Sequence, residues 1–156
     1  MYVIWITDIY STNVLSKLHT LQITGCFYIT RLSLLKFTPN LTTLRIYSCN
    51  ELHDISQVTN LSKLYSLELM SSNKITDLSC IKDLLQLNYL TIRGCGIPDV
   101  SELKSLNYLK RLHISGCKNM SELETLAEDV CKKKSRYVIL VSNLICIYLI
   151  KLYFHI

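Results

Sequence analysis

The chain has 156 residues, 49% of them hydrophobic, and carries a formal net charge of +5. This length suits a single domain, whose core can fold without disulfide bonds or a structural metal ion. Three of the positive charges come from the run Lys132-Lys133-Lys134, which predicts a solvated segment after the folded repeats. Because the rest of the chain is nearly neutral, its composition argues against a nucleic-acid-binding protein.

Residues 1–17 predict a partial repeat at the start of the chain. Residues 6–9 (ITDI) match residues 75–78 (ITDL), and each segment precedes a leucine of the later repeats by the same interval. The strand half of that repeat is replaced by residues 1–5, so we expect either an improvised strand at residues 2–6 or a fragment of a longer array, and we favour the fragment. Residues 1–9 lack the basic start and long apolar stretch of a secretory signal.

A leucine ladder follows over residues 18–131. Its pattern is Leu-x-x-Leu-x-(Ile/Leu)-x-x-(Cys/Ser), and successive copies start 23, 23, 23 and 22 residues apart. The five copies begin at Leu18, Leu41, Leu64, Leu87 and Leu109. This period predicts a solenoid in which each repeat adds one short strand to a parallel sheet. The expected fold class is therefore an α/β repeat solenoid, a leucine-rich repeat horseshoe with a concave parallel β-sheet.

Each copy of the ladder is followed by apolar residues spaced three apart, as at Leu52 and Ile55. This spacing predicts short 3₁₀, helical or extended segments that keep one face inward on the convex side. Asp54, Asp77 and Asp99 recur at one position of these segments. Because aspartate commonly accepts hydrogen bonds from backbone amides two or three residues later, we interpret these aspartates as turn residues.

Seven cysteines are present, and four of them occupy the last position of the ladder: Cys26, Cys49, Cys95 and Cys117. A cysteine that recurs in a repeat predicts a small buried side chain with a free thiol. Strand spacing would permit a disulfide between Cys26 and Cys49, but such a bond would disturb the repeat geometry. The sequence contains no C-x-x-C pair, and it indicates no metal site and no cofactor. Free thiols predict a reducing, intracellular location in the cytoplasm.

Residues 132–156 comprise the lysine run and an apolar segment with alternative interpretations. A helix over residues 137–156 would be about 30 Å long, enough to anchor the chain in a membrane. Residues 137–141 also fit the strand of a degenerate sixth repeat, which their Val, Ile and Tyr content favours. A tail without a selected role is the third alternative.

Strand alternation predicts which side chains point away from the ladder, out of the concave sheet. The last four strands of the ladder place tyrosine and arginine there, the residues that often dominate binding energy at protein interfaces. The predicted protein-binding residues are Arg45, Tyr47, Glu68, Met70, Tyr89, Arg93, Arg111 and His113. The alternative is an ordinary solvated sheet, in which Arg45 and Glu68 simply pair across adjacent strands.

Residues 87–123 carry the most particular version of the repeat, LNYLTIRGCGIPDVSELKSLNYLKRLHISGCKNMSEL. The 23-residue period, the Ser/Gly-Cys that ends each strand and the ITDLS-type turn resemble the trypanosomal leucine-rich repeat proteins described as adenylate cyclase regulators. The turns are also similar to those of bacterial internalins, which keep Asn where this chain has Cys. The resemblance covers roughly residues 6–126. It implies a regulatory, protein-binding role with no catalytic residues.

Together these features predict a non-enzymatic module that binds a partner protein on its concave face. The chain has no glycine-rich phosphate loop, and its four histidines are scattered over different repeats, so we expect no catalytic residues. Two alternatives stay open: a membrane-anchored recognition protein held by residues 137–156, and a truncated remnant of a longer array.

Overall fold

A computed structural model of the chain describes residues 15–97, 100–106, 108–116, 137–141 and 146–149. Several predicted features lie outside these residues. They are residues 1–14 of the partial repeat, Asp99, Cys117, the return segment after Cys117 and the lysine run at 132–134.

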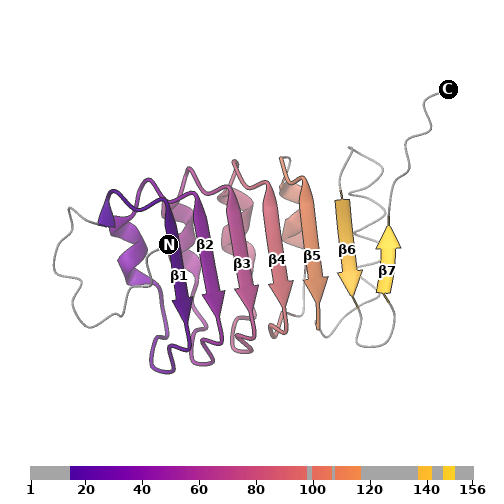
Figure 1. Cartoon of the computed structure of the whole chain (residues 1–156), viewed down its shortest axis with the longest axis horizontal. Coiled ribbons are helices and arrows are strands. Elements are labelled where there is room, and N and C mark those ends of the chain that lie inside the picture. The colour runs from indigo at the N-terminus through magenta and orange to yellow at the C-terminus, as the bar shows by residue number, and fades with distance from the viewer. Residues whose placement is uncertain (1–14, 98–99, 107, 117–136, 142–145, 150–156) are drawn as a thin grey trace.

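The described strands form one sheet (Figure 1). In sheet order they are β1 (Thr20–Thr24), β2 (Thr43–Tyr47), β3 (Ser66–Met70), β4 (Tyr89–Arg93), β5 (Arg111–Ser115), β6 (Tyr137–Val141) and β7 (Cys146–Leu149). Strands β1 to β6 are parallel, while β7 pairs antiparallel with β6. Equivalent ladder leucines are register partners, so Leu44 pairs with Leu67 and Leu67 with Leu90. The chain therefore has the predicted leucine-rich repeat solenoid.

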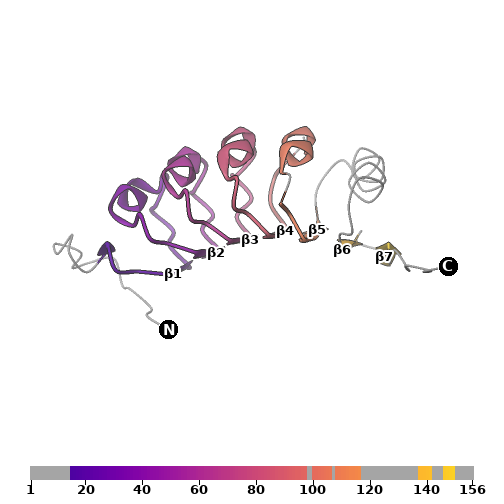
Figure 2. The same ribbon diagram turned by 90° about the horizontal axis from the view of Figure 1, so that it is seen from above.

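Short 3₁₀ helices return the chain from each of β1 to β4 to the next strand. They are η1 (Ser33–Phe37), η2 (Ser56–Asn60), η3 (Ser79–Asp83) and η4 (Ser101–Ser105). Seen along the sheet, these helices line the outer, convex side, and the strands line the inner, concave side (Figure 2). The three-residue spacing of the apolar side chains explains why these segments are 3₁₀ helices, because three residues per turn keep every third side chain on the inward face.

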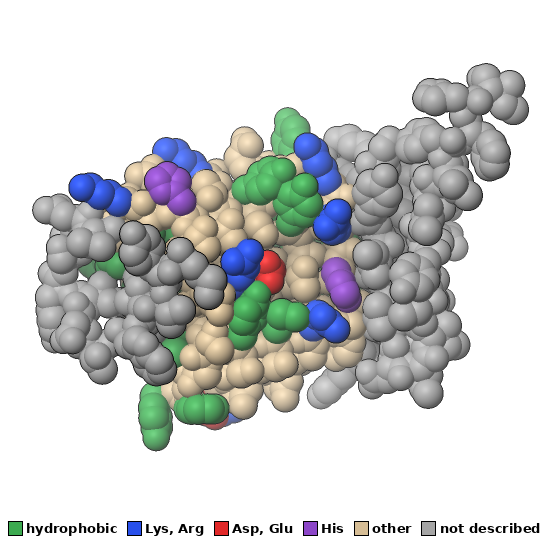
Figure 3. Space-filling model, in the orientation of Figure 1, with side chains coloured by type: hydrophobic (Ala, Val, Ile, Leu, Met, Phe, Trp, Pro, Cys, Tyr) green, Lys and Arg blue, Asp and Glu red, His purple; other side chains and the backbone are tan. Residues whose placement is uncertain are grey.

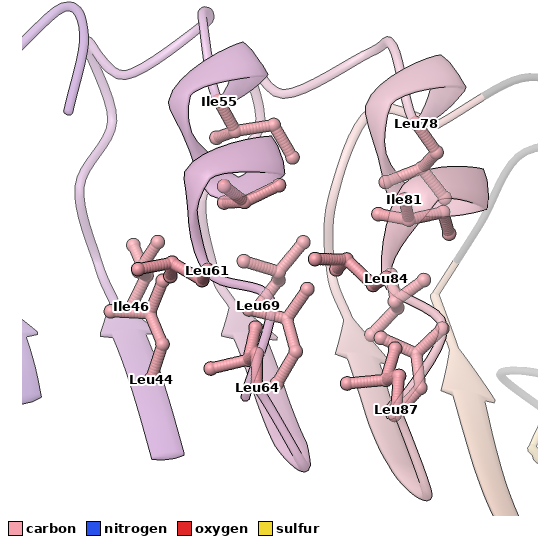
Figure 4. Packing of buried hydrophobic residues seen from close by; sticks show 14 of the residues in the cluster. Leu44, Ile46, Ile55, Leu61, Leu64, Leu69, Leu78, Ile81, Leu84 and Leu87 are labelled. Atoms are coloured by element: carbon pink, nitrogen blue, oxygen red, sulfur yellow. The ribbon is translucent and has the colours of Figure 1, made fainter. Parts of the chain in front are cut away.

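The core lies between the sheet and the return segments. Leu44 and Leu69 point toward it from the strands, while Ile55 and Ile81 come from the return segments (Figure 4). All four side chains are essentially inaccessible to solvent. The two apolar periodicities of the sequence, one from each strand and one from each 3₁₀ segment, thus meet in one continuous hydrophobic layer.

A left-handed turn residue directly follows each of strands β1 to β5. These residues have φ between 52° and 67° and are Gly25, Ser48, Ser71, Gly94 and Gly116. In the first four, the amide donates to the carbonyl of the last residue of the next strand, as from Ser48 to Met70 at 2.9 Å. Two repeats therefore hold a serine in a conformation that favours glycine.

Replacing Ser71 by glycine should stabilise the fold by about 0.5 kcal/mol. The left-handed conformation costs a non-glycine residue about 1–2 kcal/mol, which glycine avoids. The greater conformational freedom of glycine in the unfolded chain offsets about 0.5–1 kcal/mol of this stabilisation. Urea denaturation followed by circular dichroism measures this difference. Ser66→Gly, in the extended strand β3, is the matched control and should destabilise; a Ser71→Gly variant less stable than the natural chain would contradict the expectation.

The last ladder position supplies a hydrogen-bond donor at the ends of β1 to β4. The thiol of Cys49 lies 3.4 Å from the carbonyl oxygen of Tyr47, and the hydroxyl of Ser72 donates to Met70 at 3.2 Å. Burial raises the pKa of the thiols of Cys49 and Cys95, which keeps them protonated as donors at neutral pH. This donor role explains why serine can replace cysteine in the third repeat.

The expectation that every ladder cysteine is buried is wrong for Cys26. Cys49 and Cys95 are buried free thiols, whereas Cys26 is a partly exposed free thiol. Cys26 follows β1, which is the first strand of the described sheet and therefore has a neighbouring strand on one side only.

The two described members of the repeated aspartates, Asp54 and Asp77, act as turn residues, as predicted. A carboxylate oxygen of Asp54 accepts the amide of Ser56 at 2.9 Å, and one of Asp77 accepts the amide of Ser79 at 2.7 Å. Hydrogen bonds from these serines lower the pKa of both carboxyl groups. Each aspartate thus satisfies an amide at the start of a 3₁₀ helix that has no partner within that helix.

The C-terminal segment continues the sheet at the residues described there. Strand β6 pairs with β5 in the ladder register, with Val138 opposite Leu112. A single helix over residues 137–156 is therefore not formed, because Val, Ile and Tyr favour strands and the edge of β5 offers unpaired backbone groups. Strand β7 was not predicted. Among the described residues, no helix has the length and apolar character needed to cross a membrane.

Candidate functional site: the concave face

The candidate site is the concave face, defined as the outward-facing residues of β2 to β5. Sheet register arranges these side chains in three rows that cross the strands. The rows are Thr43, Ser66, Tyr89 and Arg111; Arg45, Glu68, Thr91 and His113; and Tyr47, Met70, Arg93 and Ser115. All eight predicted binding residues belong to these rows, and each is half-buried or exposed. Positive and apolar side chains gather over the middle of this face (Figure 3).

A hydrogen-bonded cluster of Arg45, Tyr47 and Glu68 occupies the centre. Nε of Arg45 donates to Oε1 of Glu68 at 2.9 Å, and the Tyr47 hydroxyl donates to Oε2 of the same carboxylate. Burial, followed by the hydrogen bond to Glu68, raises the pKa of Tyr47 to about 12. The hydrogen bond to Glu68 is also the largest cause that raises the pKa of Arg45.

The pairing of Arg45 with Glu68 matches the alternative interpretation of the face as a solvated sheet. Their side chains are 35% and 24% exposed, and such a pair contributes at most about 1 kcal/mol to stability. The consequence for the face is geometric. The cluster fixes the Tyr47 ring, and Met70 is its register partner on β3, so the centre presents an ordered apolar surface around a neutralised ion pair.

An aromatic group lies at the edge where the strands begin. The rings of Tyr65 and Tyr89 meet edge to face, with centroids 5.1 Å apart and planes inclined at 61°. The guanidinium of Arg111 lies 5.6 Å from the centroid of Tyr89. Tyr65 is 41% exposed, and the sequence prediction missed it because it precedes β3 and falls outside the strand alternation. An aromatic residue directly before a predicted strand is the signal that could have identified it.

A basic group lies over the other half of the face, on β4 and β5. Arg93 and Arg111 are exposed, and His113 lies between them along the sheet. Burial, followed by the positive charge of Arg93, lowers the pKa of His113. Nε2 of His113 is buried and has no hydrogen-bond partner among the described residues. At neutral pH the fixed charges of this group are therefore the two guanidinium groups.

The lowered pKa of His113 predicts that the fold becomes less stable as the pH falls below 6.5. In that range the unfolded chain binds more protons at this histidine than the folded chain does, so stability rises with pH. His113→Gln should reduce the difference in unfolding free energy between pH 7.5 and pH 5.5, measured by urea denaturation. His53→Gln, which changes an exposed histidine, is the control. An equal reduction of this pH-dependent difference in both variants would contradict its assignment to His113.

The described residues do not assemble a metal-binding group on this face. They contain no cluster of three or more His, Cys, Asp or Glu side chains placed to hold a metal ion. A hollow beside η2 and η3 is lined by Asp54 and Asp77, among others, but both carboxylates already accept backbone amides. The arrangement on the concave face is suited to contact with another surface.

Comparison with known proteins supports the fold. No protein-family model matches the chain, and no curated protein matches it. Among solved structures, the functional domain of InlJ from Listeria monocytogenes, which includes a cysteine ladder, matches with a TM-score of 0.55 and 20% identity over 70% of this chain and 22% of that one.

Two further structures are similar. An internalin from Listeria monocytogenes, InlF, has a TM-score of 0.52 and 23% identity over 88% of this chain and 51% of its own. A leucine-rich repeat protein of Leptospira interrogans has a TM-score of 0.64 and 17% identity over 85% of this chain and 35% of its own. These matches show the leucine-rich repeat fold and do not show the resemblance to trypanosomal cyclase regulators. The chain spans 22–51% of the length of these three proteins.

Proposed function

We propose that the chain is a non-enzymatic protein-binding module whose partner occupies the concave face. The observation that carries the proposal is the ordered set of tyrosine, methionine and arginine side chains on β2 to β5. Tyrosine and arginine are the residues most enriched among binding hot spots. The contacts of Tyr47 with Glu68 and of Tyr89 with Arg111 hold these side chains in place before binding, which reduces the conformational entropy lost on association.

The dimensions of the face favour a short segment of the partner. The four strands β2 to β5 at about 4.8 Å and five residues at about 3.3 Å make a surface of roughly 19 Å by 16 Å. This is less than half of the roughly 800 Å² that each partner contributes to a standard interface. One helix or loop of a partner protein matches this area.

A regulatory role and a cytoplasmic location are further parts of the proposal. The resemblance of the repeat motif to that of trypanosomal adenylate cyclase regulators supports a regulatory role. The thiols of Cys49 and Cys95, which hydrogen-bond to carbonyl oxygens at the strand ends, support a reducing compartment, because oxidation would remove these donors.

Affinity capture from lysate of the native cell tests the proposal. The resin carries the natural chain or a variant with Tyr47, Met70 and Tyr89 changed to alanine. We expect this concave variant to lose the specifically captured protein. A convex variant with Lys36, Thr59 and Lys82 changed to alanine is the control and should retain it. Circular dichroism checks that both variants fold, and equal capture by all three chains would contradict the concave site.

A further inference from the structure

The fixed charges of the concave face do not balance. Its charged side chains at neutral pH are Arg45, Glu68, Arg93 and Arg111. The carboxylate of Glu68 is occupied by Arg45 and by the Tyr47 hydroxyl. Within the part of the chain that the structure describes, neither Arg93 nor Arg111 forms an ion pair. Two exposed positive charges thus remain, one on β4 and one on β5.

The positions of the two arginines set the spacing of the groups that they can bind. Arg93 is the register partner of Ser115 at the end of β5, while Arg111 begins β5. Four residues of strand separate the backbone positions of the two arginines by about 13 Å. The Arg111 guanidinium is held over Tyr89 at the start of β4, whereas Arg93 ends that strand, so the pair suits two carboxylates carried on one segment.

Each arginine has an apolar neighbour on the same face. Arg111 lies over the ring of Tyr89 at 5.6 Å, and Arg93 is the register partner of Met70. The Tyr65 ring extends the apolar surface beside Tyr89. A ligand that fits this half of the face therefore combines negative charge with apolar side chains.

We infer that the β4–β5 half of the concave face binds an acidic segment of the partner protein, with two carboxylates that pair with Arg93 and Arg111. The inference rests on the proposed function and specifies the chemistry of its partner. Charge complementarity carries it, because the face offers two uncompensated arginines between apolar side chains. A nucleic acid fits less well, since its binding relies on many contacts between basic side chains and phosphates, and here a carboxylate lies at the centre of the face.

Fluorescence anisotropy with a defined peptide tests the inference. The probe is a labelled twelve-residue peptide with two glutamates four positions apart and leucines between them, and the comparison peptide carries lysines in place of the glutamates. We expect the natural chain to bind only the glutamate peptide. Changing Arg93 and Arg111 together to glutamine should weaken binding about tenfold or more, and raising the salt from about 0.05 M to 0.5 M should weaken it as well.

The matched control removes two positive charges from outside the concave face. Arg31 and Lys82 are exposed, and changing both to glutamine should leave the affinity within about twofold, since charges beyond a Debye length are largely screened. Three results would overturn the inference: no binding of the glutamate peptide, binding that the arginine variant retains, or tighter binding of a twelve-nucleotide single-stranded DNA.

The same variants separate this inference from the proposed function. If the alanine variant of Tyr47, Met70 and Tyr89 loses the native partner while the Arg93/Arg111 variant captures it undiminished, the concave site stands and the acidic segment is refuted. If both variants lose the native partner and the glutamate peptide binds as expected, both proposals are supported.

Discussion

Truncating Leu67 to alanine should lower the free energy of unfolding by about 2–5 kcal/mol, the range for removing a large aliphatic side chain from a packed core. Leu67 is fully buried and lies on β3, between its register partners Leu44 and Leu90. Repeats on both sides restrain the backbone, so the cavity cannot close by local collapse. Urea denaturation followed by circular dichroism measures the loss.

Leu85→Ala is the matched control for Leu67→Ala. It deletes the same atoms from a side chain that is 66% exposed, and surface changes of this kind are usually within about 0.5 kcal/mol. Equal losses in the two variants would refute the assignment of Leu67 to the core. Because each repeat contacts mainly its neighbours, a broadened transition in Leu67→Ala would indicate that the two halves of the array unfold separately.

Changing Gly96 to alanine should destabilise the fold by about 3 kcal/mol, at the upper end of the range for inserting atoms into a packed site. A Cβ atom at residue 96 would lie 2.2 Å from the backbone carbonyl oxygen of Asn73. No side-chain rotation relieves a clash with backbone, so the turn between β4 and η4 must move. Thermal and urea unfolding both measure the loss.

Gly25→Ala is the control for Gly96→Ala. Gly25 has a φ of 65°, and a Cβ atom added there would meet no neighbouring atom within 4 Å. The loss of stability in Gly25→Ala should therefore come only from the left-handed backbone conformation, which costs alanine about 1–2 kcal/mol. A smaller loss of stability in Gly96→Ala than in Gly25→Ala would contradict the prediction, because it would show that the turn can move at little cost. Gly96 belongs to the repeat that is one residue shorter than the others, and the shorter turn explains its close approach to Asn73.

The inward residues were predictable because the pattern of buried positions repeats along the chain. The positions of Leu44 and Leu67 in the ladder, and of Ile55 and Ile81 in the return segments, follow directly from the 23-residue period and the spacing of three. Both periods arise from backbone geometry, which is the same in every repeat. Strand β7 has no such signal, because it pairs antiparallel with β6 outside the repeat.

The candidate site was predictable only as a set of positions. Alternation identified the eight outward residues, and adjacent repeats suggested the pairing of Arg45 with Glu68. The participation of Tyr47 and the contact of Tyr65 with Tyr89 could not be predicted, because both depend on side-chain direction across neighbouring strands. Sequence spacing gives the neighbours of a residue in such a sheet, but it does not give their rotamers.

The sequence by itself determined the repeat architecture, a parallel sheet with short return segments on its convex side, because burial of the ladder residues at a fixed interval sets the register of neighbouring strands. The tertiary structure decided which charges on the concave face are neutralised. Glu68 is shared by Arg45 and Tyr47, so Arg93 and Arg111 are left without an acidic partner among the described residues. The physical reason is that an ion pair depends on the direction of long side chains from separate repeats, which packing sets and the repeat period does not.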